Sequence, residues 1–137
     1  DFRGPTRQMF QEIVVPLADR CRFIEPDASI IEGLTALNAF GHSAGHMAFH
    51  VESDGNELMI LSDTIANYAV SLANLEWQFS MDDNPEMAIE SRKRIVGMAA
   101  ASKAPIIAFH MPFPSVGYIE QSGNSYRWTP ATYQLNL

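Results

Sequence analysis

The chain has four histidines, and their placement around one aspartate is its most informative chemical feature. His42, His46 and His50 fall within nine residues, whereas His110 follows a short apolar segment much later in the chain. Asp63 stands between them, just after another apolar run. A carboxylate at the end of an apolar strand needs a partner, because burial of an unpaired charge is costly. Two strand ends and one glycine-containing turn that deliver such residues to a common rim would form a metal site.

Each of these residues also has a plain structural interpretation. His42 and His46 could be turn histidines, and His110 could be a hydrogen-bonded histidine of the core. Asp63 could cap the helix that follows it, which is a common role for aspartate. His50, in the middle of an expected strand, is expected to face solvent or to support a ligand from behind rather than to bind a metal. No single signal is strong, and the metal hypothesis rests on the ordered combination.

Hydrophobic periodicity and turn residues predict helices and strands that form an α+β fold with a mixed sheet. The sequence Asn84-Pro85-Glu86 predicts a helix start, since Asn caps, Pro fits the first helical position and an acid favours the first turn. The continuous apolar run 58–61 predicts a strand that is buried on both faces. The expected helices are 5–21, kinked or shortened by Pro16, part of 66–74, and 84–102, and the expected strands are 22–25, 29–32, 34–40, 47–53, 57–62, 105–109, 117–121 and 125–128.

Length and composition indicate one globular domain. The chain has 137 residues and a mass of 15.2 kDa, which leaves little room for a second domain. Hydrophobic residues make up 47%, which excludes a disordered chain, and the charged fraction of only 18% suggests that part of the surface is covered. The net charge of −7 argues against nucleic acid as a partner, because an acidic surface repels phosphates. No apolar run reaches the ~18 residues that a membrane-spanning helix needs.

Cysteine usage and the start of the chain leave the compartment open. Cys21 is the only cysteine, which excludes an internal disulfide and a cysteine-rich zinc module. The chain opens at Asp1 with neither an initiator methionine nor a signal pattern, as a chain entered in the middle would. Both a cytoplasmic and a periplasmic location are compatible with these features.

The order of the candidate residues resembles one hydrolase family. The segment GHSAGH over 41–46, then a strand pair, Asp63, a helix and a strand that ends at His110 resembles the C-terminal half of metallo-β-lactamase-fold hydrolases. The fuller strings GHSAGHMAFHVES, LSDT and FHMPFP are most similar to the branch that contains methyl parathion hydrolase and related lactonases. The resemblance runs from about residue 23 to residue 128. It implies half of a four-layer αββα sandwich, a mixed sheet with helices on one face.

The resemblance also implies roles for the candidate residues in a dinuclear metal site. His42 would ligate the first ion, His110 would ligate the second, and Asp63 would be the catalytic carboxylate that bridges both. His46 would stand behind the ligands and hold the turn. The two divalent ions would be zinc first, with manganese, iron or cobalt as alternatives. A hydroxide that bridges the ions would attack an ester, lactone or phosphotriester, so the partner is a small-molecule substrate.

The sequence departs from this family in one respect that matters. The remaining ligands of the family come from an HxHxDH motif in its N-terminal half, and no such string occurs in residues 1–137. His42, Asp63 and His110 alone fall short of the three protein ligands usual for each catalytic zinc. We therefore expect a single incomplete domain over 1–137 that is inactive in isolation. It should pair with a missing N-terminal half or with a second copy, as a homo-oligomer, because half a sandwich would expose an apolar sheet face.

Two further expectations concern the substrate pocket and the competing function. The expected pocket walls are Trp77 and Phe79 from an aromatic segment and Met111 and Phe113 from the stretch after His110. The alternative function is a non-catalytic metal-binding or interaction module that holds an ion through the histidine cluster. Substrate identity stays open, because one scaffold serves several chemistries through changes in its loops.

Overall fold

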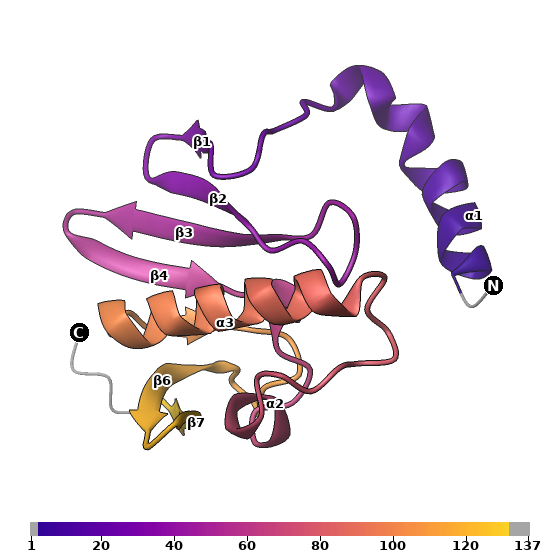
Figure 1. Ribbon diagram of the computed structural model, residues 1–137. Helices are drawn as coiled ribbons and strands as arrows, with labels where there is room; N and C mark the ends of the chain where they lie inside the picture. Colours follow the sequence, from indigo (N-terminus) through magenta and orange to yellow (C-terminus); the bar gives the residue numbers. More distant parts are fainter. Residues whose placement is uncertain (1–2, 132–137) are drawn as a thin grey trace.

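The computed structural model describes residues 3–131, which form one mixed seven-stranded sheet with helices (Figure 1). The strands follow one another across the sheet in chain order, from β1 to β7. All neighbours are antiparallel except β4 and β5, which are parallel. In chain order the elements are α1 (Gly4–Ile13), η1 (Val15–Arg20), β1 (Ser29–Ile31), β2 (Leu34–Asn38), β3 (Met47–Ser53), β4 (Asn56–Ile60), η2 (Ser62–Thr64), α2 (Val70–Ala73), α3 (Pro85–Ser102), β5 (Ile106–Ile107), β6 (Val116–Ser122) and β7 (Ser125–Pro130).

The long helix α3 forms where the sequence predicts it. The Asn84 side chain accepts a hydrogen bond from the Met87 backbone N–H at 3.0 Å, and Pro85 occupies the first turn. The helix ends at Ser102, because the next residue, Lys103, has a φ of 57° in the left-handed region and stops the helical hydrogen bonding. The predicted cap and span are confirmed. Within residues 3–131, neither α3 nor any other helix is long and apolar enough to cross a bilayer.

Helix α3 packs on one face of the sheet, which we call the covered face. Strand register places Leu37, Ala48, Met59, Ile106 and Ile119 on this face. Each of them is at most 7% exposed, and all belong to one hydrophobic core with the inner side of α3. Burial of these apolar side chains is the main stabilising contribution to the fold.

No helix within residues 3–131 packs on the opposite face of the same sheet (Figure 1), which we call the open face. Ala36 is fully buried on this face, whereas the larger apolar side chains there are only half-buried: Leu34, Met47, Phe49, Val51, Leu58, Ile60, Ile107, Val116 and Tyr118. The prediction that run 58–61 is buried on both faces is therefore wrong for this chain. Met59 and Leu61 are buried toward the core, whereas Leu58 and Ile60 point to the open face.

The N-terminal helical arm, α1 with η1, stands apart from the sheet (Figure 1). The predicted interruption near Pro16 is confirmed, since α1 ends at Ile13 and the 3-10 helix η1 begins at Val15. Neither helix buries any residue, and the apolar stripe is exposed at Phe10 and Leu17, among others. The arm therefore contributes apolar surface rather than core.

Three other element predictions need correction. The segment 22–25 forms no strand, because no neighbouring strand pairs with it, although Arg22 donates a hydrogen bond to the Ile30 carbonyl at 2.7 Å. The helix expected within 66–74 is a single turn, α2. The strand expected over 105–109 pairs only at Ile106 and Ile107 before the chain turns away.

Candidate metal site

The one parallel strand pair brings Asp63 and His110 together. Because β4 and β5 run in the same direction, their carboxyl ends lie at one edge of the sheet, and each residue follows its strand by three positions. His110 Nε2 lies 3.0 Å from Asp63 Oδ1. The backbone turns sharply on both sides of this contact, since Ser62 (φ 52°) and His110 (φ 64°) adopt the left-handed conformation that non-glycine residues rarely take. Such conformations are often found at functional sites.

The turn before His42 is fixed against the start of α3. Gly41 has φ of 121°, and a Cβ atom there would clash with the Ala88 backbone nitrogen, so only glycine fits. The Gly41 carbonyl accepts a hydrogen bond from the Asn84 N–H at 2.9 Å. Gly45, by contrast, has a Cβ position with no atom within 4 Å, so its neighbours leave room for a side chain. The first glycine therefore positions the histidine turn.

His46 joins the turn to the strand end that holds Asp63. Its Nδ1 lies 2.8 Å from the Ala39 carbonyl, and its Nε2 accepts a hydrogen bond from the Asp63 backbone N–H at 3.1 Å. These two contacts require a neutral ring with the proton on Nδ1. Burial lowers the pKa of His46 below its ordinary value, which favours the same neutral form.

His42, Asp63 and His110 line one cavity of about 590 Å³. The segment that connects Asp63 to α3, which we call the connecting segment, supplies the remaining lining residues: Ala66, Gln78, Phe79, Ser80 and Met81. Imidazole and carboxylate donors suit several divalent metals. Within residues 3–131, however, no three histidine, cysteine or acidic side chains converge closely enough to enclose an ion. The donors fit a metal by kind, but this part of the chain gathers them into an incomplete set.

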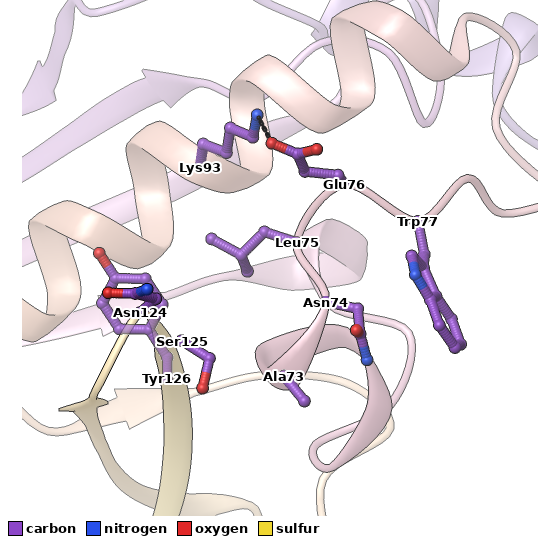
Figure 2. A pocket seen from close by; sticks show the side chains of 9 residues that line it. All are labelled: Ala73, Asn74, Leu75, Glu76, Trp77, Lys93, Asn124, Ser125 and Tyr126. Atoms are coloured by element: carbon purple, nitrogen blue, oxygen red, sulfur yellow. Dashed lines mark hydrogen bonds and ion pairs between the residues drawn. The ribbon is translucent and has the colours of Figure 1, made fainter.

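The other predicted pocket residues lie in different places. Phe79 lines the cavity, but Trp77 borders a separate hollow of about 470 Å³ between α2, α3 and the turn after β6. Figure 2 shows the Trp77 ring at the margin of that hollow, away from Lys93. Met111 is part of the hydrophobic core, and Phe113 is 86% exposed. One of the four expected walls thus meets the cavity in this structure.

The structure argues against two of the plain structural interpretations, the helix cap at Asp63 and the core histidine at position 110. Asp63 does not cap α2, whose N-cap residue is Ala69 with no side-chain cap; the nearest side-chain support is Asn67, whose Oδ1 accepts from the Ala69 and Val70 N–H groups at 2.9 Å. The His110 side chain is 55% exposed and so is no core histidine. His50 lies at the margin of the covered face, opposite Met59, with its Nε2 3.5 Å from Glu57 Oε2.

Two residues at the site escaped the sequence analysis. Asp82 has a buried side chain, and its Oδ1 lies 3.0 Å from His42 Nδ1. Arg92, in the middle of α3, is 1% exposed and contacts the other Asp82 oxygen at 3.5 Å. Burial lowers the pKa of Arg92, and the Asp82 carboxylate opposes that shift. A sequence signal for Arg92 did exist: it lies in helical phase with the buried Ala88 and Ile95.

The sheet order and the covering helix are those of part of the metallo-β-lactamase fold, and solved structures of hydrolases with that fold superpose on the chain. AidC, a dizinc quorum-quenching lactonase solved with N-hexanoyl-L-homoserine as product, gives a TM-score of 0.83 at 23% identity. The hydrolase AbOPH of the β-lactamase superfamily gives 0.83 at 24% identity, over 93% of this chain and 44% of its own. A probable metal-dependent hydrolase from Staphylococcus aureus gives 0.65 at 18% identity, over 84% and 42%.

These similarities establish the fold of the chain. The chain spans less than half of the solved structures that it matches, 43% in the case of AidC, while 92% of its own length is covered. Neither a protein-family profile nor a curated protein matches the sequence. The structural neighbours named here are hydrolases, and AidC among them is described as dizinc.

Proposed function

We propose that this chain supplies His42, Asp63 and His110 to the dinuclear metal site of a hydrolase that cleaves an ester, lactone or phosphotriester. In this proposal Asp63 bridges two divalent ions, His42 binds one ion and His110 binds the other. When bound, such ions activate water and polarise the bond that is cleaved. The branch that includes methyl parathion hydrolase and related lactonases is the proposed placement within the superfamily.

The observation that carries this proposal is the meeting of three distant segments at one cavity. His42 comes from a turn, whereas Asp63 and His110 come from neighbouring strand ends 47 positions apart in sequence. Such a convergence of metal-type donors beside an open cavity is what a metal hydrolase needs. The names of the structural neighbours, a lactonase and an AbOPH hydrolase among them, support the same class of reaction.

The proposed partner is the remaining part of the sandwich, with a second copy of the chain as the alternative. The open face offers a continuous row of half-buried apolar side chains, and the arm adds exposed ones. Sheets that pack face to face bury such rows in a shared core. The partner would also supply the metal ligands that the three donors lack, since residues 3–131 contain no complete set.

The alternative function is a non-catalytic module that binds a metal or another protein. The incomplete donor set among the described residues favours this reading, because one or two donors can hold an ion weakly without activating water. The two functions differ in metal stoichiometry and in turnover, and both quantities can be measured on one preparation.

The test is metal analysis and hydrolysis by the protein expressed from its complete gene. We expect about two divalent ions per chain and turnover of at least one substrate from a panel of lactones, aryl esters and phosphotriesters. His42→Ala, Asp63→Asn and His110→Ala should each lose metal and reduce kcat/KM at least a hundredfold. His50→Ala is the matched control, because this histidine lies outside the cavity beside Glu57.

Each outcome separates the two functions. Two ions with turnover that the three variants abolish would support the hydrolase. Binding of one ion without turnover would favour the non-catalytic module. Equal loss of metal in His50→Ala would contradict the ligand assignment.

A further inference from the structure

The cavity histidine His42 is held from behind by a buried carboxylate. Its Nδ1 lies 3.0 Å from Asp82 Oδ1, and the Asp82 side chain is only 1% exposed. An ionised carboxylate only accepts hydrogen bonds, so the proton of a neutral His42 ring must be on Nδ1. Because His42 lines the cavity, Nε2 is the ring nitrogen that remains for a ligand there.

The carboxylate is itself held by the one buried guanidinium that α3 places inside the connecting segment. Arg92 Nη2 lies 3.5 Å from Asp82 Oδ2. The same side chain donates from Nε to the Thr64 carbonyl at 3.1 Å and from Nη1 to the Trp77 carbonyl at 2.9 Å. Its Cζ also lies 4.0 Å from the centre of the Phe79 ring, a cation–π distance.

These contacts make Arg92 the internal support of the segment that runs from Asp63 to α3. Thr64 adjoins Asp63 in sequence, and Phe79 forms part of the cavity wall. The Arg92 guanidinium therefore contacts the residue next to Asp63 directly, and it reaches His42 through Asp82. A planar fork with five donors can serve several acceptors at once, which a lysine ammonium cannot do in the same geometry.

We propose that Asp82 and Arg92 are positioning residues that fix the His42 ring with Nδ1–H toward Asp82 and Nε2 toward the cavity. Hydrogen bonds of this kind set the tautomer and orientation of metal-binding histidines, and their loss commonly weakens metal binding 10- to 100-fold. That Nε2 binds a metal ion rests on the proposed function. The tautomer itself does not, because it follows from the contact between two side chains.

The experiment measures the tautomer directly by two-bond 1H–15N NMR of the ¹⁵N-histidine-labelled protein, expressed from its complete gene and stripped of metal with a chelator. The His42 signals are assigned by their loss in His42→Gln. We expect Nδ1–H in the wild type, conversion to predominantly Nε2–H in Asp82→Ala, and a mixture in Arg92→Lys. The control is Lys93→Met, which breaks the 2.7 Å ion pair between Lys93 and Glu76 on the same helix and segment but leaves Asp82 in place.

A wild-type His42 with the proton on Nε2 would overturn the proposal without any variant, even if Asp82→Ala fails to fold. An unchanged His42 tautomer in folded Asp82→Ala would overturn it as well. An unchanged His42 tautomer in Arg92→Lys would show that Arg92 has no positioning role.

A parallel Zn²⁺ titration separates this inference from the proposed function. If the wild type binds no Zn²⁺ while the tautomer depends on Asp82, the metal hydrolase fails and the positioning contact stands. If Zn²⁺ binds equally well to the wild type and to folded Asp82→Ala, the positioning role fails and the metal site stands.

Discussion

The two faces of the seven-stranded sheet carry the same kinds of apolar side chain but bury them to different extents. On the covered face, Met59 and Ile106 are at most 2% exposed beneath α3. On the open face, their strand neighbours Ile60 and Ile107 are only half-buried, although they are equally apolar. Apolar composition alone therefore does not tell which face holds the chain together. The difference teaches that the larger apolar side chains of the open face are suited to a contact that residues 3–131 do not make themselves.

The largest expected effect is on the free energy of unfolding, when Met59 on the covered face and its neighbour Ile60 on the open face are each truncated to alanine. Met59→Ala should destabilise the 137-residue chain by about 2–5 kcal/mol, since it opens a cavity in the packed core. Ile60→Ala should cost about 1 kcal/mol, because its side chain loses less burial. Urea unfolding of both variants measures the two free energies. Equal costs would show that the open face is packed in solution, and the contrast between the faces would then disappear.

A smaller effect is expected on association through the open face. Phe49 lies between Ala36 and Ile60 on that face, and Phe49→Glu would bring a charge into any contact there. We expect the 137-residue chain to self-associate at micromolar concentration, and Phe49→Glu to weaken that association more than tenfold, about 1.4 kcal/mol. Sedimentation velocity measures both. Met98→Glu on the exposed side of α3 should have no effect, and a wild-type chain that stays monomeric would contradict the prediction.

The smallest expected effect is on the pH dependence of stability, through the buried side chain of His46. The pKa of His46 is lowered in the folded chain, so the unfolded chain takes up a proton at a higher pH than the folded one. The contribution of the neutral ring to stability is therefore complete above about pH 6.5, the ordinary value, and is lost as the pH falls below it. Urea unfolding between pH 7.5 and 5 with chelator present should show this loss in the wild type and less of it in His46→Gln. Parallel pH profiles for the two proteins would contradict it.

Local signals allowed the long helix and most of the strands to be predicted from the sequence. The cap at Asn84 and the proline after it define the start of α3, and both act within one turn of chain. The strand expected over 22–25 failed for the opposite reason, since a strand needs a partner and none lies beside this segment. The open face was also beyond local reasoning, because an apolar run such as 58–61 reads the same whether one face or two are covered.

The candidate site shows the same division between local and distant information. Residue type and order were enough to select His42, Asp63 and His110, which line one cavity. Asp82 was not selected, because an aspartate in a loop looks ordinary until the fold brings it to a histidine 40 positions earlier. Arg92 was discoverable in principle, since a charged residue in phase with a buried helix face must find partners inside.

The single parallel pairing of β4 with β5 has a consequence for how the chain acquires its chemistry. The chain between Met59 and Ile106 contains α2 and α3, so this pairing closes a long loop. Non-local pairings of this kind tend to form late, because closing a long loop costs entropy before the contact repays it. We therefore expect the contact between Asp63 and His110 to form late in folding, so that a partly folded chain lacks both the cavity and the paired donors.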